Sequence, residues 1–456
     1  MNIYKIPISV MEDKELCIIL PTTWQQLVSD QDKQIIEVSF GMIDLQVPIR
    51  FHVGNQLILS KLLAQAIGFP YSTTILHVLI NKKVIRIGPL FGIYAKEEHT
   101  GNFGQQNKLL IDFMRRCAKN GLAGMVFSPG NIDFKEKKAY AAYYCFEKDT
   151  WNYVRMPLPD IIMDRGIYGN SNQWRVAHQD RIKLRQIKQI THFNAGFADK
   201  YVTHKILLDN AIINQYLPET YLLKSQSTLL EMLDRHKEVY IKPVNGTMGQ
   251  GIIKVTSKNN TYLVQTNTNR YTFQGLKKFK AFISRSILTS ISQNQLLIQQ
   301  GIDLTKSNQR IIDFRVLLQK RPNLRWGVTA IVARIGQQQT ITSNISKGAN
   351  VKNGELVLKE IAKKTKQDPE HLIQHIKDVA LLTAFTLETK NGDYGELGID
   401  IGVDRNGKPW IIEVNPRPGR KALKMLDVAL RDKSIENPVI YSLELWLHRI
   451  RRDYSE

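Results

Sequence analysis

The chain has 456 residues and a formal net charge of +21, from 63 Lys and Arg against 42 Asp and Glu. Hydrophobic residues make up 43% and charged residues 23% of the sequence, which excludes a disordered, a collagen-like and a disulfide-scaffold protein. The charge predicts an anionic partner, and nucleic acid, a membrane surface, phosphates and polycarboxylates are the candidate classes. The length suggests about two to four domains.

Cysteine usage and the N-terminus both predict a cytoplasmic protein made in a reducing compartment. The 3 cysteines form no CxxC pair, so we expect free thiols rather than a disulfide framework. Glu12, Asp13 and Glu15 lie where a signal peptide would need its apolar run. No stretch approaches about 18 uninterrupted apolar residues, so no transmembrane segment is expected.

Residues 1–85 predict a mainly β region. Ile35–Phe40 and Leu45–Arg50 show the alternation and β-branched content of strands. The segment Gln56–Ile67 has helical spacing and is followed by Gly68, a common helix end.

Residues 86–194 predict a small α/β domain, because strand patterns alternate with a helical one. One long strand is expected over Val84–Tyr94, and a helix over Asn107–Lys119. A second strand, Gly124–Ser128, is expected to end in a Ser-Pro-Gly-Asn loop. Two further strands are expected at Trp151–Pro157 and Ile161–Arg165.

Residues 195–456 predict a larger mixed domain. Its helices are expected at Lys200–Asn214, Pro369–Thr389 and Pro438–Asp453. Asp368 precedes the second of these as an N-cap, and the proline that follows occupies the first helical position. The third is expected to dock its apolar side on the protein, although its basic residues also suit a membrane-surface helix.

A Gly-rich loop follows a strand that carries Lys242. Gly246, Gly249 and Gly251 allow backbone N–H groups to wrap an anion, and the lysine adds positive charge. The spacing matches neither GxGxxG nor GxxxxGK[ST], and an ordinary Gly-rich hairpin is the alternative. From Tyr240 to Ile302 the chain has no acidic residue, which indicates either a solvated basic face or an anion-binding lobe.

A hairpin near the C-terminus carries three oxygen ligands. Asp400 lies on its first strand, and Glu413 and Asn415 lie two residues apart on its second, so all three can share one face. Hard oxygen ligands of this kind suit Mg²⁺ held together with nucleotide phosphates. A polar wet face is the alternative, but the apolar neighbours Ile399 and Ile411 favour a buried site.

Two further patterns have competing interpretations. Asp313 and Arg315 lie on one face of a strand, where the arginine can bind phosphate oxygens or form an intrastrand ion pair. His371 and His375 have the spacing of a zinc pair on a helix, but no third ligand is evident, so we interpret them as surface histidines.

Taken in order, these segments resemble the ATP-grasp superfamily, and most closely its YheC/YheD endospore coat-associated family. The resemblance is strong from about residue 195 to 425. It implies an α/β and α+β protein: an ATP-grasp domain at 195–456, a pre-ATP-grasp α/β domain at 86–194 and the N-terminal β region. It also implies ATP and one or two Mg²⁺ ions as cofactors, with Mn²⁺ as a substitute.

The resemblance assigns roles residue by residue. Lys200 matches the first nucleotide-contacting lysine, with Lys205 as the competing choice, and Lys242 matches the lysine that meets the phosphates. Asp400, Glu413 and Asn415 match the Mg²⁺ ligands. The flap over the triphosphate corresponds to Gly246, Thr247, Met248, Gly249, Gln250 and Gly251.

Other matches concern adenine, ribose and the reacting groups. The hinge that reads adenine runs through Gln299, Gln300 and Ile302, with Asp303 as the ribose partner, although many relatives carry a glutamate at the glutamine pair. Arg315 matches the phosphate arginine, and Arg417 or Arg420 is expected to hold the substrate carboxylate. The inner polar loop corresponds to Asn344, Lys347 and Gly348.

The implied reaction is ligation of a carboxylate to an amine, or less often a thiol, through an acyl phosphate. A non-catalytic ATP-binding protein of the spore coat uses the same residues and stays open as an alternative. The implied partners are ATP, carboxylate and amine substrates of polyanionic character, and spore-coat proteins. Nucleic-acid binding is the least favoured interpretation, because the chain has no RRM, KH or zinc-finger signature.

Overall fold

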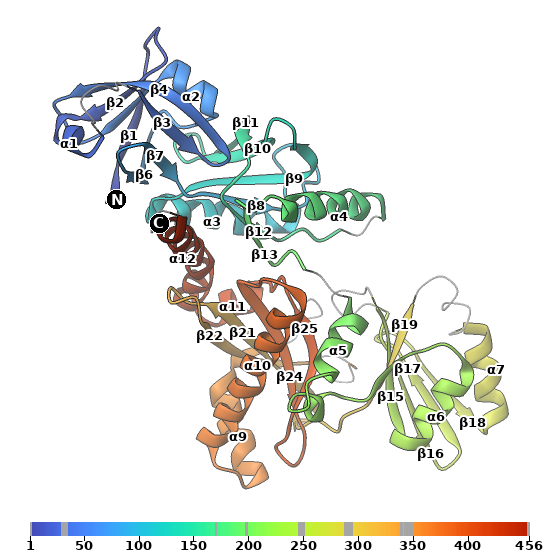
Figure 1. The fold of residues 1–456 in the computed structure, drawn as a ribbon. Helices are drawn as coiled ribbons and strands as arrows, with labels where there is room; N and C mark the ends of the chain where they lie inside the picture. Colours follow the sequence, from blue (N-terminus) through green and yellow to red (C-terminus); the bar gives the residue numbers. More distant parts are fainter. Residues whose placement is uncertain are drawn as a thin grey trace. The chain divides into compact units, whose positions relative to one another are not determined.

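The computed structural model describes residues 2–28, 35–168, 171–196, 199–244, 251–286, 295–337, 341 and 350–453 (Figure 1). Its contacts group into two units. The first comprises Met1–Ala195, Lys320–Arg325 and Asp432–Glu456, and the second comprises Gly196–Gln319 and Trp326–Arg431. The domain boundaries expected from the sequence stay a prediction.

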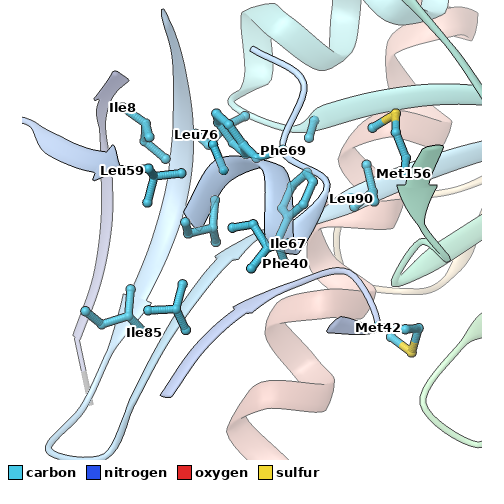
Figure 2. Packing of buried hydrophobic residues seen from close by; sticks show 14 of the residues in the cluster. Ile8, Phe40, Met42, Leu59, Ile67, Phe69, Leu76, Ile85, Leu90 and Met156 are labelled. Carbon is cyan, nitrogen blue, oxygen red and sulfur yellow. The ribbon is translucent and has the colours of Figure 1, made fainter. Parts of the chain in front are cut away.

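The N-terminal part of the first unit is a closed β-barrel, in agreement with the predicted β region. Its strand order is β1-β5-β2-β4-β3-β7-β6. Alternating side chains of these strands fill one hydrophobic core, part of which Figure 2 shows around Phe40 and Leu76. The strands are β1 (Asn2–Met11), β2 (Ile18–Pro21), β3 (Ile35–Phe40), β4 (Ile43–His52), β5 (Leu57–Ser60), β6 (Thr73–Ile80) and β7 (Val84–Gly88).

The helix expected over Gln56–Ile67 is wrong in its first half. Leu57–Ser60 forms strand β5, and helix α2 spans only Lys61–Ile67. The Ser60 hydroxyl accepts the N–H of Leu63 at 3.2 Å, so this residue caps the helix and ends the strand. Gly68, with φ of +69°, closes the helix as the sequence predicts.

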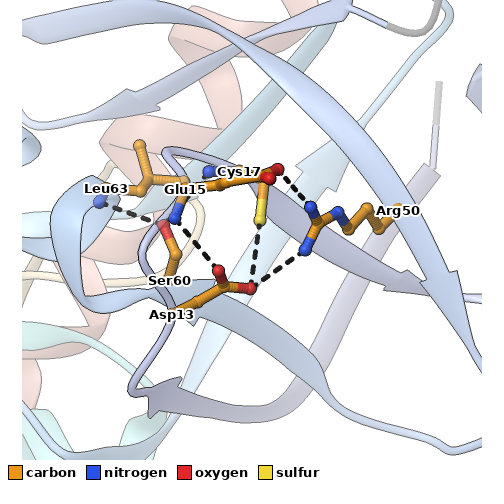
Figure 3. A network of polar contacts seen from close by, with 6 residues as sticks. All are labelled: Asp13, Glu15, Cys17, Arg50, Ser60 and Leu63. Atoms are coloured by element: carbon orange, nitrogen blue, oxygen red, sulfur yellow. Dashed lines mark hydrogen bonds and ion pairs between the residues drawn. The ribbon is translucent and has the colours of Figure 1, made fainter.

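A polar network lies beside this cap (Figure 3). Arg50 contacts Asp13 at 3.0 Å and also pairs with Glu15, and the Ser60 hydroxyl accepts the N–H of Cys17 at 3.1 Å. Burial raises the pKa of the Cys17 thiol, against the lowering effect of the nearby guanidinium. All cysteines are free, which confirms the expected absence of a disulfide framework.

A six-stranded sheet forms the α/β part of the first unit, in the order β11-β10-β9-β8-β12-β13. Strands β8, β9, β12 and β13 run parallel, as the predicted parallel unit requires. The elements are β8 (Leu90–Tyr94), β9 (Ala123–Asp133), β10 (Lys138–Cys145), β11 (Thr150–Pro157), β12 (Ile161–Asp164) and β13 (Thr191–Phe193), with helices α3 (Asn107–Asn120) and α4 (Ser171–Gln186).

Two strand boundaries in this region differ from expectation. The single strand expected over Val84–Tyr94 is divided at Pro89, so β7 closes the barrel while β8 joins the sheet. Proline has no N–H to donate to a ladder, which explains the break. The loop expected after Ser128 is part of β9, and a register shift in its pairing with β10 accommodates these residues.

The C-terminal helix α12 spans Val428–Asp453 and therefore starts before Pro438, where the sequence predicts its beginning. Proline is tolerated inside this helix, although it disfavours continuation. Trp446 is fully buried and packs with Leu79 and Ile450, so the predicted docking of the apolar side is confirmed. Within the described part of the chain, no helix is long and apolar enough to cross a membrane.

The second unit contains two six-stranded sheets. The first is antiparallel, with the strand order β14-β19-β15-β16-β17-β18. Helices α6 (Gln226–His236) and α7 (Leu276–Ser286) pack on it through residues such as Met232 and Phe279. The strands are β14 (Thr220–Leu222), β15 (Glu238–Pro243), β16 (Ile253–Lys258), β17 (Thr261–Gln265), β18 (Arg270–Gln274) and β19 (Leu296–Gln300).

The other sheet has the order β23-β22-β21-β24-β25, with the short β20 (Lys306–Ser307) paired to β21. Asp368 caps the helix that follows Pro369 by accepting the N–H of His371 at 2.7 Å, as predicted. The elements are β21 (Arg310–Lys320), β22 (Trp326–Ile335), β23 (Asn350–Asn353), β24 (Glu396–Val403) and β25 (Pro409–Asn415), with helices α9 (Gly354–Thr365), α10 (Pro369–Asn391) and α11 (Lys421–Leu426).

Helix α5 spans Lys200–Leu208, so the helix expected to reach Asn214 is too long. The side chain of Asn210 accepts the N–H groups of Ile212 and Ile213 at 3.0 and 3.2 Å. Such local side-chain acceptors compete with helical hydrogen bonds, which explains the early end.

Candidate functional site

The candidate site is built on the hairpin of β24 and β25. In the turn between the two strands, the Asp404 carbonyl accepts the N–H of Gly407, whose φ is +78°. Asp400 lies directly opposite Glu413, and Asn415 follows two residues later. Residues opposite one another point to the same face of a sheet, so the three oxygen ligands share one face.

A β-bulge at Ile412 creates this arrangement. Ile401 lies opposite Ile411, but the next residue, Asp400, lies opposite Glu413, so one residue of β25 has no partner. Because side chains alternate between faces, a shift of one residue moves every later side chain to the other face. The bulge therefore brings Glu413 to the side of Asp400 rather than toward the core.

Two arginines bind the Asp400 carboxylate. Arg315, directly opposite on β21, donates from Nη2 to Oδ2 at 2.9 Å and from Nε to the other oxygen. Arg334 of β22 places its Nη2 at 2.9 Å from Oδ2. Burial alone raises the pKa of Asp400, but the two guanidinium charges outweigh burial and hold that pKa below its usual range.

Asp313 does not pair with Arg315 on its own strand, so the intrastrand ion pair considered as the alternative does not form. Its carboxylate accepts a bond from Nε of Arg334 at 2.5 Å, while Arg315 turns to Asp400. Burial lowers the pKa of Arg334, and the charges of both carboxylates reverse that effect and raise it. Arg334 is a site residue that we did not identify in the sequence, because its partners lie on two other strands.

Lys242 of β15 is buried, with 8% of its surface exposed. Its Nζ donates to Oε1 of Gln299 at 2.9 Å, and the amide of Gln299 donates to the Thr220 hydroxyl at 3.0 Å. Burial lowers the pKa of Lys242 to about 8; the nearby Glu413 carboxylate acts against this shift, and the charge of Lys200 adds to it. The lysine thus lies within electrostatic reach of the metal-ligand candidates.

Helix α5 brings a second lysine to this cluster. Lys200, at its first position, places Nζ at 3.4 Å from the Glu413 carboxylate. Lys205 instead extends over the Tyr201 ring at 4.8 Å and is exposed. The structure therefore groups Lys200, and not its competitor, with Glu413, while the nucleotide contact itself stays a prediction.

His204 was missed by the sequence analysis and lies one helical turn after Lys200. Burial, together with the charge of Lys242, lowers the pKa of His204 to about 4. The imidazole is therefore neutral near pH 7. The spacing of four residues from Lys200 is the signal that places both side chains on one face of the helix.

The predicted adenine and ribose residues lie on β19 and beyond it. Gln300 accepts the N–H of Glu219 at 3.1 Å and so ties β19 to β14. Ile302 is half-buried, and its carbonyl accepts the N–H of Leu304. Asp303 is exposed and pairs with Arg405 at 2.6 Å. Their contacts to a nucleotide stay predictions.

Part of the predicted site lies outside the described residues: Gly246, Thr247, Met248, Gly249 and Gln250 of the flap, and Asn344, Lys347 and Gly348 of the polar loop. Gly251, at the end of the flap, is described and has φ of +69°. A side chain there would also approach Pro243 within 3.0 Å, so two independent constraints favour glycine.

The two arginines considered for the substrate carboxylate have different surroundings. Arg420 is 4% exposed and pairs with Glu396, which is fully buried and also accepts a bond from Gln319 at 3.1 Å. That arginine already neutralises an internal carboxylate. Arg417 is half-buried and stays the predicted carboxylate-binding residue.

Replacing Arg420 with Met is expected to lower the free energy of unfolding by about 3–5 kcal/mol, because the fully buried Glu396 would lose the guanidinium with which it pairs. Replacing Arg417 with Met should change it by about 1 kcal/mol or less. Urea unfolding followed by circular dichroism measures both. Equal losses in the two variants would contradict the structural role assigned to Arg420.

The residues at the hairpin fit a divalent cation by their chemistry. Two carboxylates and one amide provide hard oxygen donors on a single face. The Asn415 amide nitrogen donates to the Asp400 carboxylate at 3.4 Å, which holds the two side chains together. The histidine pair does not make a second metal centre: Nε2 of His375 is hydrogen-bonded to the Tyr216 hydroxyl at 2.9 Å. Among the described residues, no group of three His, Cys, Asp or Glu side chains is placed to hold a metal.

Several known proteins are similar to this chain. A family model described as YheC/D like ATP-grasp matches residues 189–445. The endospore coat-associated protein YheD of Bacillus subtilis (strain 168) is 28% identical over 433 residues, 92% of this chain and 91% of that protein. The endospore coat-associated protein YheC of the same strain is 25% identical over 316 residues, 68% of this chain and 85% of that protein. Among solved structures, D-alanyl-alanine synthetase A from Vibrio cholerae O1 biovar eltor str. N16961 has a TM-score of 0.46 and 12% identity, covering 77% of this chain and 99% of that chain.

Proposed function

Because the chain belongs to the YheC/D-like ATP-grasp family, we propose that it is an ATP- and Mg²⁺-dependent ligase that joins a carboxylate to an amine or a thiol. The observation that carries the proposal is the grouping of two cations with the oxygen ligands. Lys200 pairs with Glu413, and the charges of Glu413 and Asp400 act on the buried Lys242. A polyphosphate with its cation requires this combination of charges.

The lysines provide the attraction for the triphosphate. Lys242 is desolvated, so its ammonium interacts with a phosphate oxygen more strongly than an exposed lysine would. Its present acceptor, the Gln299 amide oxygen, is uncharged and can be exchanged for a phosphate at little electrostatic cost. Lys200 would then neutralise charge beside Glu413.

Asp400, Glu413 and Asn415 would hold Mg²⁺, or Mn²⁺ in its place. When bound, the ion supplies charge neutralisation for the phosphates. Glu413 is the carboxylate with more room for exchange, since 32% of its side chain is exposed against 7% for Asp400. Arg315 and Arg334 fix the Asp400 carboxylate in one orientation.

In the proposed reaction, a substrate carboxylate oxygen attacks the γ-phosphorus of ATP, the bond to the leaving ADP oxygen breaks, and an acyl phosphate forms. The amine nitrogen then attacks the acyl carbon, phosphate leaves and the nitrogen loses a proton. Arg315 uses Nε and Nη2 for Asp400, which leaves Nη1 for developing phosphate charge. Arg417 would orient the substrate carboxylate.

A role in the spore coat is a second candidate, favoured by the names of the two Bacillus relatives, which are both endospore coat-associated proteins. On this proposal the protein acts in the cytoplasm or at the coat of a spore-forming bacterium and binds coat proteins. A binding protein and a ligase need the same nucleotide contacts. Turnover distinguishes them.

The test measures ADP release from Mg·ATP with a panel of amino acids and acidic peptides, and identifies products by mass spectrometry. A ligase should release ADP only when both substrates are present, and its product should weigh one water less than their sum. ADP at background across the panel, with ATP binding retained, would favour the assembly role. Absence of ATP binding would overturn both.

A further inference from the structure

The outer edge of the first sheet in the second unit carries a basic surface. It consists of strand β18, helix α7 and the β16–β17 turn, and we name it the basic edge. Its exposed cationic residues are Lys258, Arg270, Lys277, Lys278, Lys280 and Arg285. The chain segment that forms it, from Tyr240 to Ile302, contains no Asp or Glu. This segment therefore contributes only positive side-chain charge to the edge.

These charges have few partners within the chain. In the part that the structure describes, no ion pair involves Lys258, Arg270, Lys277, Lys278 or Lys280. Nearer the centre of the sheet the situation differs, because Lys254 on β16 pairs with Glu238 on β15 at 2.8 Å. Positive charge is thus neutralised inside the sheet and left available at its edge.

The basic edge is also remote from the candidate site. Lys242 lies on β15, and the sheet order places β16 and β17 between that strand and β18. At roughly 4.8 Å per strand, β18 lies about 14 Å from β15. This exceeds the Debye length of about 8 Å at physiological ionic strength. A nucleotide held by Lys242 therefore does not account for the charge on β18.

The stability of helix α7 does not account for the lysines at its N-terminus. Lys277 and Lys278 lie in the first turn of α7, which has no acidic residue. The partial positive charge of a helix N-terminus disfavours lysines at these positions. The same two residues are well placed to attract an external anion, because the lysine ammonium groups and the helix N-terminus are both positively charged.

Strand β18 offers backbone groups as well as charge. Among the strands that the structure describes, it is the last of this sheet, paired with β17 on one side, and four of its five residues are exposed. An edge strand can pair with another extended chain. Pairing with β18 of a second copy would bring Arg270 and the lysines close to the same cationic residues of that copy, so charge repulsion disfavours self-pairing. A strand of opposite charge meets no such repulsion.

We propose that the basic edge binds an extended acidic segment of a partner protein, which adds a strand beside β18 while its carboxylates pair with the lysines of α7. The open backbone edge favours a polypeptide over a nucleic acid, since only a polypeptide continues the ladder. Tyr271, 42% exposed, adds an aromatic surface for the neighbouring side chains. This binding surface is separate from the proposed ligase function, and its test uses no ATP.

The experiment measures fluorescence anisotropy of labelled peptides with the full chain. One peptide alternates Glu and Thr. A second, of equal length and charge, repeats Glu-Glu-Pro-Pro, so that proline removes N–H donors from both edges of any strand that it could form. Labelled oligo-dT of similar charge is the nucleic-acid probe. The variant is Lys277→Glu with Lys278→Glu, and the control is Lys363→Glu with Lys364→Glu, two adjacent exposed lysines of α9.

The Glu-Thr peptide should bind at least about tenfold more tightly than the Glu-Pro peptide, and the α7 variant should lose about tenfold or more. The α9 variant, with the same net charge, should change the affinity less than about twofold. Equal binding of the two peptides would overturn strand addition. Equal losses in the two variants, or preferred binding of oligo-dT, would overturn the assignment of this surface to an acidic polypeptide.

Discussion

Replacing Lys242 with Ala is expected to weaken Mg·ATP binding by at least about 100-fold. The ammonium is buried, its charge is countered only at a distance by Glu413 and Asp400, and its one hydrogen-bond acceptor in the described structure is the Gln299 amide oxygen. A phosphate would replace a neutral acceptor with a charged one in a site of low dielectric. Isothermal titration of the variant with Mg·ATP measures the loss.

The matched control is Lys205→Ala. Lys205 is exposed on α5 and extends over Tyr201, so its removal should change the affinity by less than about twofold. Circular dichroism would establish that both variants are folded. Unchanged affinity in a folded Lys242→Ala protein would contradict the assignment of this site.

The pH dependence of binding tests the same ammonium without a mutation. Because the pKa of Lys242 is about 8 in the free protein, the charged form becomes the minor one as the pH rises above 8. Binding then requires uptake of a proton, so affinity should fall toward a limit of about tenfold per pH unit. The Lys242→Ala protein should lack this decline, and a decline of equal size in the variant would exclude Lys242 as its source.

Replacing Glu413 with Gln is expected to reduce Mg²⁺-dependent ADP formation by about 100- to 1,000-fold. The change keeps the shape of the side chain but removes the charge that attracts a divalent cation and pairs with Lys200. Glu413 is a better test than Asp400, because removing the Asp400 charge would leave Arg315 and Arg334 without their shared carboxylate. The assay is the rate of ADP formation as a function of Mg²⁺ concentration.

Glu370→Gln provides the control for this variant. Glu370 is 73% exposed and pairs with Lys359 on the surface at 2.8 Å, so its replacement should leave the rate within about twofold. Thermal unfolding of both proteins separates a loss of activity from a loss of stability. If Glu413→Gln retains the normal rate and Mg²⁺ dependence, the hairpin is not the metal site.

Local signals in the sequence predicted much of the fold. The ATP-grasp fold is confirmed by the family to which the chain belongs, and the Asp-Pro start of α10 and the β24–β25 hairpin form as expected. Each depends on residues within a few positions of one another. The helix predicted for the residues before Ser60 was wrong, because their apolar side chains suit a helix and a barrel strand equally. Pairing with β1 and β2 decides between the two structures.

The sequence by itself determined the chemical types at the candidate site: two lysines, hard oxygen ligands and arginines on strands that apolar neighbours keep buried. It could not supply the partners of those groups. Arg334 joins Asp313 to Asp400 across separate strands, and Arg420 is committed to Glu396 rather than to the surface. These pairings connect residues distant in sequence, so no local pattern encodes them.

The tertiary structure also decided which way the metal-ligand candidates face. Spacing alone placed Glu413 and Asn415 on one side of β25, but their side relative to Asp400 depends on the bulge at Ile412. Without it, alternation would turn both side chains toward the core. The sequence therefore shows which residue types form the candidate site. Their position on one face of the sheet depends on strand register, which only the packed sheet determines.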